Sequence, residues 1–239
     1  MSRAHPATAG GRLRDNLPMR PLLLLWAALA AAVCQTPGVR PSDPIQDQPG
    51  LPRVLLIGSS VSVGYTLPVR ARLAGVANVH RIPGMAGTTA NILPHLDGWL
   101  GDSRWDVIHF TFGLRDPTRL EDGTLAVPLA EFERNVRRIV ERLKATGAKL
   151  VWAPATPVPR DDLKPVRKTE DVLAYNAAAR AIMTANAVAV NDLYAFALPR
   201  LKELQRPDNV HFTEAGSEAL GAEVAAAIRA QLTRRRPPR

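Results

Sequence analysis

The sequence predicts an α/β fold, a three-layer α/β/α sandwich around a five-stranded, mainly parallel sheet. Between residues 52 and 232, short apolar runs alternate with longer stretches whose apolar residues recur at helical spacing. Strands separated by helices imply parallel strands joined by crossover connections. The chain has 239 residues, 46% of them hydrophobic, which is enough to bury the core of one domain. No period of about 20 to 50 residues recurs, so a solenoid is excluded.

Two strand and helix pairs open this domain. Residues 53–57 (RVLLI) form an apolar run that ends at Gly58, and residues 61–73 continue at helical spacing. Residues 78–82 are a weaker strand, and residues 88–100 form a helix with isoleucine, leucine and tryptophan on one face. Strand, turn and helix is therefore the unit that the rest of the domain repeats.

The same alternation continues to residue 232. Residues 105–112 (WDVIHFTF) form the third strand and stop at Gly113. Residues 129–146 form a helix followed by Gly147, the residue type that commonly follows a helix end. The remaining elements are strands at 149–155 and 188–191 and helices at 170–186, 193–204 and 213–232. We expect these elements to form a flavodoxin-like sheet.

The basic charge of the chain lies at its two ends. The formal net charge is +9, but residues 1–40 hold five arginines and one aspartate, and residues 234–239 hold four arginines. About +1 is left for residues 41–233, so the domain lacks the strongly basic balance of a nucleic-acid-binding protein. Residues 233–239 are typical of a disordered, solvated tail, and we expect no nucleic-acid partner.

The first 35 residues have the layout of an export signal. Residues 21–34 (PLLLLWAALAAAVC) are apolar, follow three arginines and end in small residues that suit signal-peptidase cleavage. This run is short for a membrane span, which needs about 20 residues. We expect export to the periplasm or the medium, with no stable membrane span after cleavage. A lipoprotein anchored through Cys34 and an uncleaved anchor or buried helix are the alternatives, and the proline-rich residues 36–51 are expected to be a linker.

A candidate nucleophile follows the first strand. In parallel α/β sheets, ligands bind at the carboxyl ends of the strands. The residues at that place are Gly58, Ser59 and Ser60, and the second serine opens a helix. Backbone N–H groups of a first helical turn are unpaired, so a hydroxyl here is well placed to attack beside an anion-binding site. The alternative is that these serines only cap the helix.

A candidate base lies near the other end of the domain. Asp208 and His211 are three residues apart in the loop between the last two helices. A histidine that takes a proton from serine needs a partner that fixes its tautomer and stabilises its charged form, and Asp208 can supply it. Alternatively, Asp208 caps a turn and His211 lies on the surface. No histidine pair has metal-ligand spacing and Cys34 is the single cysteine, so we expect neither a metal site nor a cofactor.

Four segments resemble the sequence blocks of the SGNH (GDSL-like) hydrolase family, and especially its exported bacterial acetylesterase-like members. They are VLLIGSSVSVGY, GMAGTT, WDVIHFTFGLRD and DNVHFTEAG, and the resemblance covers roughly residues 52–230. In this family the first block holds the nucleophile and the last block the acid and base, which implies these roles for Ser60, Asp208 and His211. The resemblance also implies an oxyanion hole that includes the backbone N–H groups of Ser60 and Gly87.

The chain departs from the family pattern at two positions. The family's G-D-S reads G-S-S, which places Ser59 where the aspartate stands. Its G-x-N-D reads G-L-R-D, so Arg115 replaces the asparagine that donates to the oxyanion. Related acetylesterase-like sequences commonly have histidine there, together with asparagine at the position of Thr111, so a basic donor is in keeping with the resemblance. We expect Arg115 in the oxyanion hole, and Ser59, Thr111 and Asp116 are candidate substrate-binding residues.

Together these features predict an exported serine ester hydrolase without a cofactor. We expect it to remove a small acyl group, acetyl above all, from a carbohydrate-like substrate, either a small molecule or a polysaccharide. The α/β-hydrolase form of serine catalysis is disfavoured, because it needs glycine two residues after the nucleophile, where this chain has Ser62. The alternative is a weakened or inactive protein of the same fold that binds a glycan or a partner at the former active site. Ser59 and Arg115, which depart from the family pattern, favour this alternative.

Overall fold

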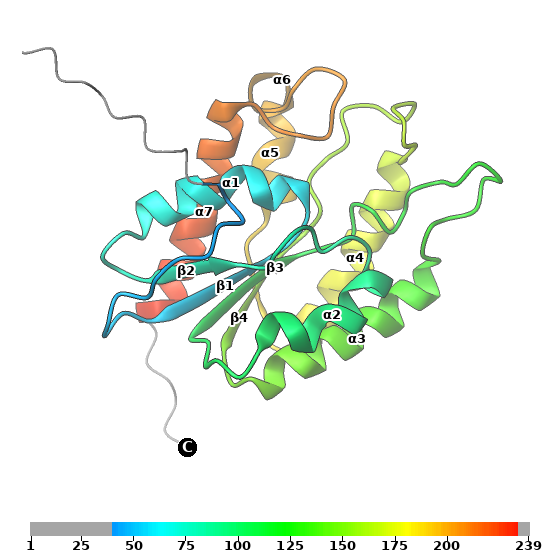
Figure 1. The fold of residues 1–239 in the computed structure, drawn as a ribbon. Coiled ribbons are helices and arrows are strands. Elements are labelled where there is room, and N and C mark those ends of the chain that lie inside the picture. Colours follow the sequence, from blue (N-terminus) through cyan, green and yellow to red (C-terminus); the bar gives the residue numbers. More distant parts are fainter. Residues whose placement is uncertain (1–39, 234–239) are drawn as a thin grey trace, which may run out of the picture. The chain divides into compact units, whose positions relative to one another are not determined.

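A computed structural model describes residues 40–233, and these form one five-stranded sheet in which every pairing is parallel. The predicted signal peptide lies outside the described residues. The strand order is β2-β1-β3-β4-β5, the flavodoxin-like order (Figure 1). The strands are β1 (Arg53–Ile57), β2 (Asn78–Arg81), β3 (Val107–Thr111), β4 (Lys149–Ala153) and β5 (Ala189–Val190). The predicted three-layer α/β fold is confirmed.

Helices cover both faces of the sheet (Figure 1). One face carries α2 (Thr89–Leu100), α3 (Leu129–Ala145) and α4 (Thr169–Ala185), and the other carries α1 (Ser60–Arg72), α5 (Leu193–Ala197), α6 (Leu201–Leu204) and α7 (Glu214–Thr233). Along β1 the side chains alternate: Leu55 and Ile57 pack with the first group, and Val54 and Leu56 with the second. Because both faces are covered, the strands read as nearly continuous apolar runs.

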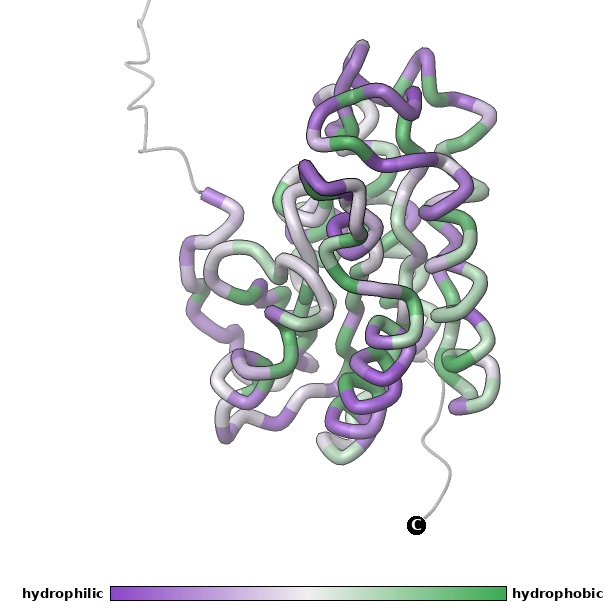
Figure 2. Tube along the Cα trace, turned by 90° about the vertical axis from the view of Figure 1, so that its right-hand side faces the viewer, coloured by the Kyte–Doolittle hydropathy of each residue, from purple (hydrophilic) through white to green (hydrophobic). Residues whose placement is uncertain are grey.

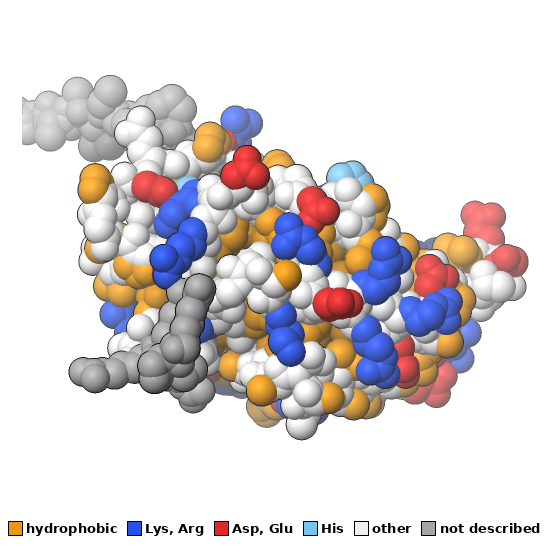
Figure 3. Space-filling model, turned by 90° about the horizontal axis from the view of Figure 1, so that it is seen from below, with side chains coloured by type: hydrophobic (Ala, Val, Ile, Leu, Met, Phe, Trp, Pro, Cys, Tyr) orange, Lys and Arg blue, Asp and Glu red, His pale blue; other side chains and the backbone are white. Residues whose placement is uncertain are grey.

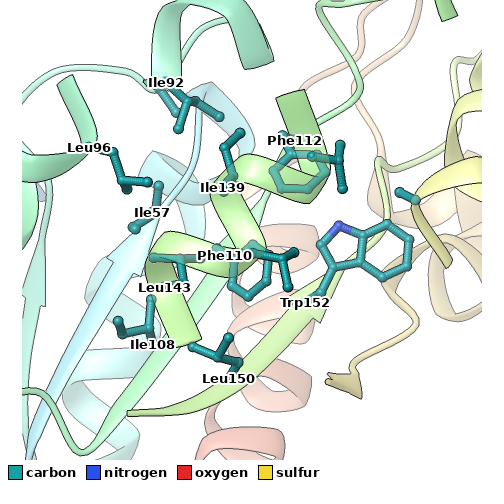
Figure 4. Close-up of a cluster of buried hydrophobic side chains, with 14 of the residues drawn as sticks. Ile57, Ile92, Leu96, Ile108, Phe110, Phe112, Ile139, Leu143, Leu150 and Trp152 are labelled. Carbon is teal, nitrogen blue, oxygen red and sulfur yellow. The ribbon is translucent and has the colours of Figure 1, made fainter. Parts of the chain in front are cut away.

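The larger apolar cluster lies between the sheet and α2, α3 and α4 (Figure 4). Ile57, Phe110 and Trp152, from three neighbouring strands, meet Ile139 and Leu143 of α3, and each is at most 2% exposed. Burying a side chain of this size contributes about 1.5–3 kcal/mol. On the helices, hydrophobic and hydrophilic residues alternate along the chain (Figure 2), as expected when one side of each helix faces the sheet.

One predicted helix is interrupted. Residues 193–204 were expected as a single helix, but α5 ends at Ala197 and a 3-10 turn (Leu198–Arg200) separates it from α6. Pro199 lies in this turn, and proline lacks the backbone N–H that a continuing helix needs. The break sets the course of the chain toward the loop that carries His211.

Residues 40–51, part of the predicted linker, are bonded to the domain. The backbone N–H of Gln48 donates to the side chain of Asn78 at 2.8 Å, and the Asn78 amide donates back to the Gln48 carbonyl at 3.0 Å. The Asp47 carboxylate lies 2.6 Å from His80 Nε2. This segment therefore flanks β2, and the folded part of the chain begins before residue 52.

The outer surface of α2 and α3 is mixed in charge. Arg142 pairs with Asp97 at 2.5 Å and Arg137 with Glu133 at 3.6 Å. Lys and Arg side chains lie among Asp and Glu over the face seen in Figure 3. Within residues 40–233, no helix combines the length and apolar character that a bilayer span requires.

Candidate active site

The turn between β1 and α1 brings two serines to the carboxyl end of the sheet. Ser59 precedes α1 and Ser60 is its first residue, so the N–H of Ser60 has no partner inside the helix. Gly58 makes this turn possible, because a Cβ at this position would lie 2.7 Å from side-chain atoms of both Ser62 and Thr111. The absence of a side chain at Gly58 therefore allows the chain to pass close to β3 and α1 just before Ser60.

The loop after β2 lies against the same turn. Gly87 has a φ of +76°, a backbone conformation that favours glycine. Its N–H, the second expected oxyanion donor, donates to the Ser59 hydroxyl at 3.1 Å. Serine at the position of the family's aspartate therefore supplies an acceptor for this N–H group.

Arg81 ties these two loops together from behind. Its side chain donates to the carbonyls of Gly58 at 3.1 Å and Gly84 at 2.6 Å, and the residue is only 8% exposed. Burial lowers the pKa of Arg81, although the guanidinium remains charged at neutral pH. Sequence reasoning missed this residue, and the one signal was a charged residue at the end of the weaker predicted strand.

Asp116 connects the loop after β3 to α2 and does not line the cavity. It is completely buried, and its Oδ1 accepts bonds from the Thr89 N–H at 2.7 Å and the Thr89 hydroxyl at 2.5 Å. Burial raises the pKa of Asp116, and the bonds from Thr89 oppose this shift. This placement does not support the expected substrate-binding role of Asp116. It supports a role in positioning the loop that carries Arg115.

His211 is held by its neighbour in the loop. Its Nδ1 lies 2.6 Å from Oδ1 of Asn209. An amide oxygen only accepts, so Nδ1 carries the proton and Nε2 has a free lone pair when the ring is neutral. Burial lowers the pKa of His211, and the charges of Arg206, Arg115 and Arg167 lower it further. The imidazole is therefore available as a base at neutral pH.

Asp208 points to a different partner. Its Oδ1 pairs with Arg160 at 3.0 Å, and its side chain is 65% exposed. The residue has a φ of +52°, which aspartate tolerates better than most residues. The partner of His211 Nδ1 is thus Asn209, which sequence reasoning missed, and the role of Asp208 stays a prediction.

A cavity of about 270 Å³ is lined both by the turn after β1 and by the loop that carries His211. Among the described residues, no hydrogen bond joins Ser60 to His211. Catalytic hydrogen bonds are often long before substrate binds. Of the expected site residues, the cavity is lined by Ser59, Ser60, Gly87, Thr111, Arg115, Asp208 and His211.

The cavity has two further charged lining residues that the sequence did not single out, Lys164 and Arg167. Arg167 follows β4 in the chain and is 8% exposed. Its burial depends on the course of the loop before α4, for which the sequence gives no signal. In the described part of the chain, no group of three or more His, Cys, Asp or Glu residues could hold a metal ion.

Comparisons with known proteins agree with this fold. The lipase/acylhydrolase of Enterococcus faecalis has 21% identity and a TM-score of 0.66, with 76% of this chain and 97% of that chain covered. The acetyl xylan esterase AlAXEase has 17% identity and a TM-score of 0.63, with 74% and 99% covered. A catalytic mutant of an acetylxylan esterase from Geobacillus stearothermophilus has 17% identity and a TM-score of 0.60, with 77% and 95% covered.

No curated protein matches the sequence. At these identities the solved structures show a shared fold. The sequence model of the GDSL-like lipase/acylhydrolase family matches residues 56–219, which is well over half of the chain and includes Ser60 and His211. The chain therefore belongs to the GDSL-like lipase/acylhydrolase family.

Proposed function

We propose that this protein hydrolyses an ester with Ser60 as nucleophile and His211 as base. One observation carries the proposal. The opening residue of α1 and a neutral histidine with a free Nε2 line one cavity, although 151 positions separate them in the chain. A hydrolase of the GDSL-like family that acts on esters is the class to which such a site belongs.

The Ser60 oxygen would attack the ester carbonyl while His211 takes its proton and then returns it to the leaving alcohol. Water, deprotonated by His211, would then attack the acyl group on Ser60, which releases the acid and restores the Ser60 hydroxyl. The N–H groups of Ser60 and Gly87 and the Arg115 side chain would stabilise the oxyanion. The Gly87 N–H would become available to the oxyanion when the Ser59 hydroxyl turns away from it. The placement of each group around the cavity supports these proposed roles.

Asp208 completes the proposed triad. Once His211 is protonated, its positive charge is repelled by Arg206, Arg115 and Arg167. A nearby carboxylate would offset this repulsion and stabilise the imidazolium. Asp208 is the one acidic residue among the described lining residues. Asn209 would hold the resting tautomer, and Asp208 would stabilise the imidazolium after it leaves Arg160.

The proposed substrate is a small acyl ester, acetyl above all, of a carbohydrate-like alcohol. The small volume of the cavity favours a short acyl group. Two of the structural neighbours are acetylxylan esterases. Export, with Cys34 lipidation as the alternative, is proposed from the apolar run at residues 21–34.

A second candidate function is binding without catalysis. Two contacts favour it: the Ser59 hydroxyl occupies the Gly87 N–H, and Asp208 pairs with Arg160. A pseudoenzyme of this kind would bind a glycan or a partner in the cavity and release no product.

Hydrolysis of p-nitrophenyl acetate and of longer acyl esters by the full chain separates these functions. We expect Ser60→Ala to lower kcat at least about 10⁴-fold without a change in melting temperature. Ser59→Ala, a matched loss of the neighbouring hydroxyl, should keep activity within about tenfold, because it removes one neutral hydrogen bond. Activity of the wild type that Ser60→Ala retains would overturn Ser60 as nucleophile, and a wild type that releases no product from any of these esters would favour the binding function.

A further inference from the structure

Arg167 is a buried cation in the wall of the cavity. It lies in the segment between β4 and α4, and 8% of its surface is exposed. It lines the same cavity as Ser60 and His211. An arginine at such a place needs either a counter-charge from the protein or one from a ligand.

The protein supplies no counter-charge that the structure describes. Within residues 40–233, no carboxylate forms an ion pair with Arg167. Its Nε is buried without a hydrogen-bond partner, and its Nη1 makes one long bond of 3.4 Å to the Pro165 carbonyl. Most of the donor capacity of this guanidinium is therefore unused.

The surroundings of Arg167 add positive charge. Burial lowers the pKa of Arg167, and the neighbouring charge of Arg115 lowers it further. Lys164 also lines the cavity, whereas Asp208, the acidic lining residue, is already paired with Arg160. The cavity therefore presents an excess of positive charge beside the proposed nucleophile.

We propose that the substrate carries a carboxylate, which binds to Arg167 in the same cavity as the scissile ester. This inference rests on the proposed function and names its substrate class. The planar guanidinium fork matches a carboxylate with two parallel hydrogen bonds. Because the cavity is only about 270 Å³, both groups belong to one small unit, such as an acetylated uronic acid or an acetylated aromatic acid.

The kinetic test compares matched esters on the full chain. Para-acetoxybenzoate and para-acetoxybenzamide differ in one charge on the alcohol side, and mono-p-nitrophenyl adipate and p-nitrophenyl hexanoate differ on the acyl side. The readout is the ratio of kcat/KM for the charged ester to that for the neutral ester, because this ratio cancels a general loss of activity. We expect Arg167→Met to lower the ratio about 10- to 100-fold for at least one pair, as the loss of a charge-assisted hydrogen bond predicts.

Lys168→Met is the matched control, since it removes a positive charge from the next residue, which does not line the cavity. It should leave the ratio unchanged. An equal fall of the ratio in Lys168→Met would show a general electrostatic effect and overturn the proposal. A ratio that Arg167→Met leaves unchanged for both ester pairs would also overturn it.

Thermal unfolding checks that Arg167→Met is folded, and the loss of a buried, unpaired charge should not lower stability. Should Arg167→Met fail to fold, Arg167→Lys decides. Lysine keeps the charge but lacks the fork, so the ratio should fall at least about threefold. An unchanged ratio in Arg167→Lys would then count against the proposal.

A binding measurement separates this inference from the proposed function. In full-length Ser60→Ala, calorimetry should show tighter binding of para-hydroxybenzoate or adipate than of para-hydroxybenzamide or adipamide, and Arg167→Met should abolish the difference. This preference, together with a wild type that shows no esterase activity, would support the carboxylate site while the proposed function fails. Esterase activity without the preference would overturn the carboxylate site alone.

Discussion

Two walls enclose the cavity, and they are held in different ways. The strand-end wall comprises the loops after β1, β2 and β3, which carry Ser60, Gly87 and Arg115. Buried groups hold it, namely Arg81 behind the first two loops and Asp116 behind the third. The loop wall comprises residues 155–167 and 205–211, where the Arg160–Asp208 pair is more than half exposed on both sides.

This difference separates a fixed half of the site from an adjustable half. An exposed ion pair is worth about 0–1 kcal/mol, so Asp208 can change partner at little cost. A buried arginine that donates to several backbone carbonyls cannot do so, because each freed carbonyl would lose its partner in a dry environment. The proposed nucleophile is therefore preorganised, and the groups around the proposed base can adapt to a ligand.

The largest effect expected from a test of this comparison concerns the loop wall. Asp208→Asn should lower kcat by about 10²- to 10⁴-fold, because it removes the charge that stabilises the imidazolium. Asn209→Ala should cost within about tenfold, since it removes a neutral hydrogen bond. The rate of p-nitrophenyl acetate hydrolysis measures both losses. Arg160→Gln, which frees Asp208 from its ion pair, should not reduce this rate. A larger loss in Asn209→Ala than in Asp208→Asn would show that His211 depends on Asn209 and not on Asp208.

Arg115 gives the next largest effect, and it tests the strand-end wall. Removal of one oxyanion donor typically costs about 10²- to 10³-fold in kcat. We expect Arg115→Ala to lower kcat on a neutral ester by a factor in that range with little change in KM, because the contact forms mainly in the transition state. A loss confined to KM would show that Arg115 binds the ground state instead.

Gly58→Ala should break the strand-end wall directly. The added Cβ meets Ser62 and Thr111 at 2.7 Å, so the free energy of unfolding should fall by about 1–3 kcal/mol. Gly98→Ala is the matched control, because a Cβ at that helical position meets nothing within 4 Å. Urea denaturation of the two variants provides the measurement. A free energy of unfolding that is equal in Gly58→Ala and Gly98→Ala would mean that the turn at Gly58 has more room than the structure shows.

The smallest effect is a shift in pH dependence. Burial and Arg206 lower the pKa of His211, so the neutral base persists below the ordinary value of about 6.5 and activity should extend into that range. Arg206→Gln removes an opposing charge, so the pKa of His211 should rise and the acidic limb of kcat/KM should move to higher pH by less than about one unit. Lys202→Gln should leave the profile in place, because Lys202 is not among the charges that lower the pKa of His211.

The strand-end wall could be predicted from the sequence, and the contacts of the loop wall could not. The sequence predicted β1 to the residue and placed the serine at its carboxyl end, because hydrophobic periodicity and parallel topology determine both. It did not predict that Asn209 would reach His211 or that Arg167 would be buried. Those placements depend on side-chain contacts between loops that are distant in the chain, and no local pattern encodes them.

The bonds between residues 40–51 and β2 also bear on the open edge of the sheet. β2 is an edge strand, and an open edge can pair with a strand of another molecule. Gln48 and Asp47 engage Asn78 and His80 of that strand, so this segment shields the edge against such pairing. A polypeptide shortened to begin at residue 52 would lose this shield, and we expect it to self-associate more readily than the longer chain.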